Sequence, residues 1–430
     1  MISSQVLTKK HILIVTYNWP PRNAIGTHRP YSWAKHFSET GIRVTVLTSR
    51  KHDFDSPLDL DLPLIANIKV VEVPYLQTTL RQSHTGKINK MIRFLKRALS
   101  RTRHLLPFDV DIRNQWRHNC YPLLESIARD ADAVISTYGP AASHLIANDI
   151  KRLKPSILWI ADYRDLWSFN PTRSANKLRT FFERRSEGSI VMKNADKITV
   201  VSSDMSEVIA SRFNRESFVI ANGFDEEEQF VRDRLTSASR KSIPGHFRFV
   251  YTGTVYKDSQ NPAPLLFALA QLKSKGKLAN VVTVDFYGSR LEPVNELNKN
   301  PLLKPFIRIM GHATRSECLK AQREANALLL MESSDINARG VLTGKVFEYI
   351  VSGTPILCIG SDPEYEIGHL LGITRTGLVY GPKQVNGLSQ LIMDTIDGRG
   401  LYDTYRPDLD EIIKYSRKRL AEKMLSLVES

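Results

Sequence analysis

The sequence contains little cysteine and no long apolar run, and both absences narrow the class of protein. Its three cysteines, Cys120, Cys318 and Cys358, lie far apart and do not have the spacing of metal ligands. A count so small and odd excludes a disulfide framework and is typical of a reducing cytoplasm. No apolar run approaches the roughly 18–20 residues that a membrane helix requires, and the stretch after Lys9 and Lys10 is too short for a signal peptide. We therefore expect a cytoplasmic protein that does not span a membrane.

Acidic residues are outnumbered by basic ones, 45 against 60, which gives a net charge of +15. Residues 80–103 contribute eight Lys or Arg and no Asp or Glu, with Ile92, Leu95 and Leu99 interleaved at helical spacing. A basic amphipathic helix over 85–103 would bind the anionic inner face of the cell membrane. An ordinary solvated helix explains the same pattern. No nucleic-acid partner is expected, because no helix-turn-helix, zinc or single-strand-binding signature accompanies the charge.

The length and the alternation of elements indicate two domains. A chain of 430 residues with 42% hydrophobic and 24% charged side chains is too long for one compact core. Apolar strands alternate with helices up to residue 220, and the alternation restarts at 247 after a polar, highly charged stretch. This alternation predicts two α/β domains of the doubly wound type. A final helix is expected over 408–429, because apolar residues follow one stripe there.

The most informative motif runs from Thr343 to Pro355. Gly344 and Lys345 open a short expected helix, and Glu348 follows before a Gly-x-Pro turn. Free backbone N–H groups at a helix start suit a phosphate, and the lysine adds a full charge. One turn further on, the glutamate can accept two hydrogen bonds from a vicinal diol such as a ribose. The motif therefore favours a nucleoside diphosphate site, although a helix that packs on a strand and ends at a glycine turn explains it too.

Other informative sequence segments lie along the whole chain. A strand at 12–17, a loop that contains Gly26, a helix and a second strand at 44–48 form a parallel βαβ unit. A glycine in such a loop allows the backbone to approach a ligand closely. The remaining segments are Ala161–Trp167, Val200–Ser203, Ile220–Asp225, Phe249–Thr254 and Arg308–His312.

Taken in order, these segments resemble those of the retaining glycosyltransferases of family four, of the bacterial surface-polysaccharide type. The resemblance covers nearly the whole chain and implies the GT-B fold: two doubly wound Rossmann-like domains that face a cleft. It implies an acceptor-side domain over 1–225, a linker over 226–245 and a nucleotide-sugar-binding domain over 246–405. A C-terminal helix within 406–430 would return to the first domain.

The resemblance also implies an activity. It is the retaining, metal-independent transfer of a sugar, of the hexosyltransferase type, from a UDP- or GDP-linked donor to a growing, lipid-linked surface glycan. Enzymes of this fold generally stabilise the leaving diphosphate with helix dipoles and cations, so no metal and no cofactor are expected. The Asp-x-Asp at Asp109 and Asp111 lies far from the donor motifs. Two alternatives stay open: a nucleotide-sugar 2-epimerase of the same fold, and a catalytically degenerate scaffold that binds nucleotide or glycan.

The resemblance assigns roles to individual residues. Lys345, Glu348 and Asp162 are the expected catalytic residues, and Asp162 would orient the acceptor or steady positive charge at the anomeric carbon. A buried Asp–Arg pair that holds a loop is the alternative explanation for Asp162 and Arg164. The expected acceptor-side residues are His28, Arg29 and Arg164. The expected donor-binding residues are Gly26, Gly253, Thr254, Lys257, Gly311, His312, Gly344 and Val346.

The chain departs from the family pattern at one position. Glu348 matches the second of two glutamates spaced eight apart, and the first falls on Gly340. In the family the first glutamate contacts the donor sugar or the transition state. Either Glu332 or Asp335 takes its place here, or the contacts to the donor sugar differ.

Overall fold

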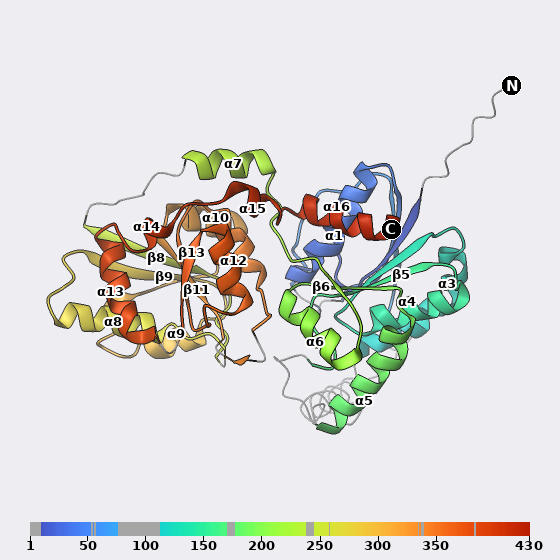
Figure 1. The fold of residues 1–430 in the computed structure, drawn as a ribbon, viewed down its shortest axis with the longest axis horizontal. Helices are drawn as coiled ribbons and strands as arrows, with labels where there is room; N and C mark the ends of the chain where they lie inside the picture. The colour runs from blue at the N-terminus through green and yellow to red at the C-terminus, as the bar shows by residue number, and fades with distance from the viewer. Residues whose placement is uncertain are drawn as a thin grey trace, which may run out of the picture. The chain divides into compact units, whose positions relative to one another are not determined.

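The chain forms two compact α/β units, each with its own sheet and core (Figure 1). The first unit is Met1–Ala221 together with Leu420–Ser430, and the second is Asn222–Arg419. The expected helix over 85–103 and the Asp109–Asp111 motif lie outside the described residues. The computed structural model describes residues 10–52, 55, 57–75, 112–169, 177–237, 245–257, 259–333, 335–336, 339–381 and 384–430.

The first unit contains a seven-stranded sheet whose paired strands are all parallel. In sheet order the strands are β3 (Ile68–Val73), β2 (Arg43–Ser49), β1 (His11–Val15), β4 (Ala133–Thr137), β5 (Leu158–Tyr163), β6 (Lys197–Val200) and β7 (Phe218–Val219). The helices of this unit are α1 (Ile25–Glu39), η4 (Ile112–Asn114), α3 (Gln115–Ala128), α4 (Ala142–Leu153), α5 (Lys177–Glu187), the π-helical turn Gly188–Met192, α6 (Ser203–Phe213) and α16 (Arg417–Glu429).

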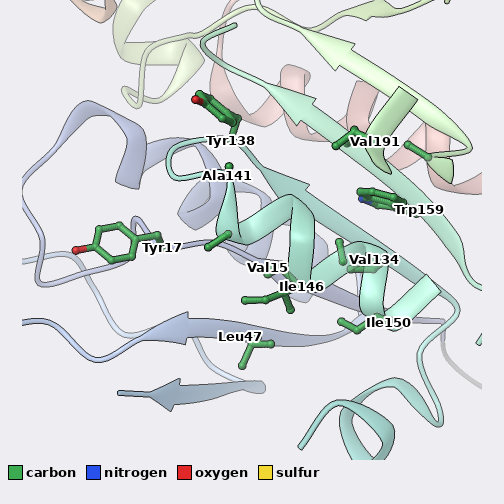
Figure 2. Close-up of a cluster of buried hydrophobic side chains, with 14 of the residues drawn as sticks. Val15, Tyr17, Leu47, Val134, Tyr138, Ala141, Ile146, Ile150, Trp159 and Val191 are labelled. Carbon is green, nitrogen blue, oxygen red and sulfur yellow. The ribbon is translucent and has the colours of Figure 1, made fainter. Parts of the chain in front are cut away.

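Strand β1 is buried on both faces, which explains its apolar sequence after His11. Because side chains alternate along a strand, Leu13 and Val15 pack with α3 and α4, in a core that Figure 2 shows in part. Ile12 and Ile14 face the opposite way and pack with α1 and with α16. The helix at the end of the chain therefore completes the core of the first unit.

The second unit repeats the same strand order with six strands. In sheet order they are β10 (Ile307–Gly311), β9 (Val281–Tyr287), β8 (His246–Thr252), β11 (Ala327–Met331), β12 (Ile356–Ile359) and β13 (Gly377–Tyr380). Its helices are α7 (Glu228–Ser237), α8 (Ala263–Ser274), α9 (Glu292–Leu297), η6 (Lys304–Phe306), α10 (Arg315–Glu324), α11 (Gly344–Ile350), α12 (Glu366–Thr374), α13 (Val385–Ile396), α14 (Leu401–Thr404) and α15 (Leu409–Ile413). Among the described helices of both units, none combines the length and the apolar character that crossing a membrane requires.

The expectation of one continuous helix over 408–429 is wrong. Helix α15 ends at Ile413, and α16 begins at Arg417. Between them, Ser416 forms a parallel bridge with Phe224. The Phe224 amide donates to the Tyr415 carbonyl at 3.1 Å, and the Arg417 amide donates to the Phe224 carbonyl at 3.0 Å. The backbone groups of this stretch therefore pair across the chain and not along a helix.

Candidate functional site

The motif that begins at Thr343 lies where the strand order of the second sheet reverses. Strands β8 and β11 are neighbours, but β9 lies on the far side of β8 and β12 on the far side of β11. The loops that leave β8 and β11 therefore diverge, and ligands of open α/β sheets bind in the crevice that such loops leave. Gly253 follows β8, Glu332 follows β11, and α11 begins at Gly344. The three segments meet at the carboxyl edge of the sheet.

Lys345 is held in place by Tyr251, the penultimate residue of strand β8. Its Nζ donates to the Tyr251 hydroxyl at 2.6 Å and lies 4.0 Å from the centroid of the tyrosine ring. The face of an aromatic ring attracts a cation, and the Tyr251 hydroxyl is itself fixed by a 2.6 Å hydrogen bond to the Thr254 carbonyl. A fully buried ring and a backbone carbonyl therefore determine where the ammonium group lies.

Gly253 makes room for this lysine. A Cβ at Gly253 would lie 3.0 Å from Lys345 Cε and 3.2 Å from its Nζ, and the φ angle of +126° is unfavourable for any other residue. The Gly253 amide donates to the Tyr287 carbonyl at 2.7 Å, which ties the turn to strand β9. Only glycine allows the turn and the ammonium group to approach this closely.

Glu332 lies beside Lys345 and balances its charge. Burial lowers the pKa of the Lys345 ammonium and raises the pKa of the Glu332 carboxyl, and the attraction between the two opposes both shifts. Glu332 also accepts a 3.1 Å hydrogen bond from the Thr343 hydroxyl. Of the two residues considered as substitutes for the family's first glutamate, Glu332 is therefore next to the lysine, whereas Asp335 is exposed. Gly340 is buried and supplies no side chain.

Glu348 belongs to a charged network at the start of helix α10. Its Oε1 lies 3.1 Å from Nη2 of Arg315, and that nitrogen is also 3.5 Å from Asp225 Oδ2. Asp225 is in turn paired with Arg417. A carboxylate offers about four lone-pair positions, and the Glu348 side chain is 30% exposed. It can therefore accept hydrogen bonds from a diol while Arg315 holds one of its oxygens.

The other expected donor residues of the second unit occupy different places. Gly311 ends β10 with a φ of +75°, and its carbonyl accepts a 2.7 Å hydrogen bond from the Gly288 amide. His312 is exposed, and β10 is two strands away from β8 in the sheet. Lys257 is exposed in the loop after β8, whereas Val346 is fully buried in the core side of α11.

In the first unit, hydrogen bonds from neighbouring side chains occupy both carboxylate oxygens of Asp162, so neither is left to bind the sugar acceptor. It is fully buried in β5, and Oδ1 accepts from Arg29 Nη2 and the Thr199 hydroxyl, both at 2.7 Å. Oδ2 accepts from Arg29 Nε at 3.1 Å and from the Thr137 hydroxyl at 2.8 Å. This contradicts direct contact between Asp162 and an acceptor. It supports the alternative of a buried ion pair, although the partner is Arg29 and not Arg164.

Arg29 is equally committed, and Arg164 lies elsewhere. The Arg29 side chain also donates to the Ala221 carbonyl at 2.7 Å and is buried, as is His28. Three of its five N–H groups are thus used inside the first unit, and contact of Arg29 with acceptor or phosphate stays a prediction. Arg164 donates from Nε to the Tyr138 carbonyl at 2.9 Å. Its guanidinium lies against the first turn of α1, where a Cβ on Gly26 would come within 2.2 Å of Nη1.

The sequence does not indicate that Tyr251, Arg315 and Thr343 contact the expected site residues. Tyr251 belongs to an apolar strand, where an aromatic residue is more often part of the core. Arg315 opens an ordinary surface helix. Their roles depend on which side chains the fold brings together, and only a known neighbour or a structure could have indicated them.

Comparisons with known proteins identify structures of similar fold, but no family model or curated protein of similar sequence. No family model and no curated protein matches the sequence. A glycosyltransferase from Rickettsia africae ESF-5 matches 98% of both chains with 13% identity and a TM-score of 0.58. WaaG, a glycosyltransferase involved in lipopolysaccharide biosynthesis, matches 97% of this chain and 99% of its own, with 11% identity and a TM-score of 0.57. An E. coli structure described as trehalose-6-phosphate bound with UDP-2-fluoro glucose matches 98% of this chain and 99% of its own, with 10% identity and a TM-score of 0.59.

At identities of 10–13%, the likeness to these proteins shows the fold alone. Two parallel sheets of seven and six strands, with helices between the strands, match these proteins over nearly the full chain. The expected GT-B fold, with two doubly wound Rossmann-like domains, is confirmed.

Proposed function

We propose that the chain is a glycosyltransferase that transfers a sugar from a nucleotide sugar to a glycan. The observation that carries the proposal is the position of Lys345, fixed by Tyr251 and Gly253 at the strand-order reversal of the second sheet. Glycosyltransferases are among the proteins that share the fold, and one neighbour is described with a bound nucleotide sugar. A ligand with phosphate at Lys345 and ribose at Glu348 fits a nucleoside diphosphate.

The proposed chemistry uses the lysine as a fixed cation. When the bond from the anomeric carbon to the diphosphate breaks, negative charge builds up on the leaving oxygen. A positive charge that is already in position stabilises this developing negative charge without reorganisation. Helix α11 has only seven residues, so its dipole is small, and the ammonium group of Lys345 supplies most of the stabilisation. In this proposal Glu332, which interacts with Lys345, holds the lysine in position and contacts the donor sugar.

The finer parts of the proposal follow the family resemblance. We infer retaining transfer of a hexose without a metal ion, from a UDP- or GDP-linked donor to a lipid-linked surface glycan. The test is the release of free nucleoside diphosphate from a panel of UDP- and GDP-sugars, with and without a lipid-linked acceptor extract and with EDTA present. Acceptor-dependent release supports transfer. Turnover of the donor without acceptor indicates epimerisation or hydrolysis, no turnover indicates a scaffold, and loss of turnover with EDTA indicates a metal.

Replacing Glu348 tests the nucleotide site. We expect Glu348→Ala to weaken nucleoside diphosphate binding by about 1–3 kcal/mol, the range for hydrogen bonds to a charged group. Titration calorimetry with UDP and GDP measures the effect. Glu324→Ala, at the opposite end of α10 from Arg315, is the control and should bind normally. Normal nucleotide binding by Glu348→Ala would contradict the assignment of the ribose to Glu348.

The basic segment tests the membrane part of the proposal. Each basic residue near an anionic surface contributes about 1 kcal/mol, so reversing the charge at Arg93, Lys96 and Arg97 should release the protein from anionic vesicles. Co-sedimentation over a salt series measures binding, and transfer to a water-soluble acceptor should be largely unchanged. Equal binding to neutral and anionic vesicles, or no binding at low salt, would contradict membrane attachment.

A further inference from the structure

Helix α5 presents large apolar side chains outward and buries both of its acidic side chains, the reverse of the usual arrangement in a surface helix. Leu178 is 52% exposed, Phe181 59% and Phe182 46%. Their i, i+3, i+4 spacing places them on one side of the helix, and the two phenyl rings pack edge to face with centroids 5.6 Å apart. Single exposed apolar residues are common, but a contiguous group of them marks an interaction site. We call these three residues the α5 apolar face.

The opposite side of α5 is polar and is tied to the first unit. Arg179, Glu183 and Glu187 recur there every four residues, and all three are buried. Arg179 Nε donates to Glu183 Oε1 at 2.9 Å, and the Ser168 amide and hydroxyl both donate to Glu187 Oε2, the amide at 3.1 Å. The π-helical turn that follows α5 places Val191 in the core. These contacts fix the orientation of the helix, so the α5 apolar face points to solvent.

The exposed charges of α5 are all positive. Its two acidic residues are buried, whereas Lys177, Arg184 and Arg185 are exposed. Each of these three lies three or four positions from Phe181 and therefore beside it on the helix surface. Among the described residues, no ion pair involves any of the three. A partner that covers the α5 apolar face must therefore combine apolar depth with negative charge.

We propose that α5 docks on an anionic membrane surface. Phe181 and Phe182 enter the boundary between headgroups and acyl chains, and the basic side chains beside them contact lipid phosphates. Arg185 shares the side of the phenylalanines, and its long stem allows the guanidinium to reach the headgroups. A bilayer meets both requirements at once, because acyl chains lie directly below a layer of phosphates. The docking rests on the contacts of α5 and not on the proposed sugar transfer, and it is separate from the basic segment 80–103.

The first experiment measures vesicle binding by co-sedimentation. The full chain is titrated with phosphatidylcholine vesicles that contain or lack phosphatidylglycerol, at low and at high salt. We expect Phe181→Ser/Phe182→Ser to weaken binding to the anionic vesicles at least tenfold at either salt concentration, because burial of two phenyl rings is lost. Phe267→Ser changes a phenylalanine of α8 that is 51% exposed and should bind as wild type does.

Equal binding by wild type and a folded Phe181→Ser/Phe182→Ser protein overturns the proposal. Binding that high salt abolishes, and that does not depend on the phenylalanines, has the same consequence, because the basic segment 80–103 then accounts for it. Arg184→Gln/Arg185→Gln should reduce the preference for phosphatidylglycerol about tenfold or more, since two positive charges near the anionic surface are removed.

The second experiment asks whether α5 enters the bilayer. Phe182→Trp should show fluorescence quenching by brominated acyl chains beyond that of wild type, whereas Phe267→Trp should not. Absence of this extra quenching overturns the proposal. If Phe181→Ser/Phe182→Ser changes the mass of the lipid-free protein in light scattering but not its vesicle binding, a second copy covers the face and the proposal is overturned. If vesicle binding depends on α5 but no sugar transfer is found, the proposed function fails and the membrane surface stands.

Discussion

Replacement of Lys345 by methionine should lower the turnover of sugar transfer by about 10²–10³-fold, the cost of removing one fixed group that stabilises developing charge. Methionine retains the length and apolar character of the lysine stem, so packing against the Tyr251 ring should persist. The measurement is kcat from the release of nucleoside diphosphate. Tyr251→Phe removes the hydroxyl that holds the ammonium at 2.6 Å and should cause a smaller loss in the same direction.

The pH dependence provides a check on this assignment. Because burial lowers the pKa of Lys345, the ammonium loses its proton at a lower pH than an exposed lysine does. Binding of a diphosphate should therefore weaken as the pH rises through that lowered pKa, and this weakening should be absent in Lys345→Met. Lys320→Met, a change at an exposed lysine on α10, should leave turnover and pH dependence as in wild type. Unchanged kcat in Lys345→Met would contradict the donor site proposed here.

Replacement of Asp162 by alanine should destabilise the first unit by about 3–5 kcal/mol, because it leaves the buried guanidinium of Arg29 without its counterion. Urea denaturation should show this as an earlier transition of one unit, because two units need not unfold together. The exposed Glu39→Ala, which breaks contacts to Lys35 and His36, should cost no more than about 1 kcal/mol.

The double change Asp162→Leu/Arg29→Met separates burial from chemistry. Removing both charges leaves no unpaired ion in the core, so the double variant should be more stable than Asp162→Ala.

Activity per folded molecule should stay close to wild type in Asp162→Asn. If Asp162→Asn folds normally but turns over at least about tenfold more slowly, a barrier change of about 1.4 kcal/mol, then Asp162 takes part in the transfer and is more than a structural ion pair.

The architecture could be predicted because it depends on local pattern. Residues 12–15 of β1 and the whole of β11 are unbroken apolar runs, and the alternation of such strands with helices defines the doubly wound class without any knowledge of contacts. The motif around Lys345 could be found for the same reason, since a glycine, a lysine and a glutamate at helical spacing are visible in one short window.

Pairings between distant residues could not be predicted. Asp162 and Arg29 are 133 positions apart, and nothing in either segment shows that one side chain neutralises the other. The break between α15 and α16 has the same origin, because Ser416 pairs with Phe224 across the chain. The apolar stripe that predicted one helix is real, but a backbone partner from elsewhere interrupts it.

The return of α16 to the first unit makes that unit discontinuous and has a consequence for biogenesis. Leu420, Ala421 and Met424 cover the face of the sheet that Ile12 and Ile14 present, and the Lys197 ammonium donates to the Leu427 carbonyl at 2.7 Å. During translation the entire second unit emerges from the ribosome before these residues do. The nascent first unit therefore carries an uncovered apolar face until α16 (Arg417–Glu429) has been synthesised, so a truncation before Arg417 would expose the core of the part made first.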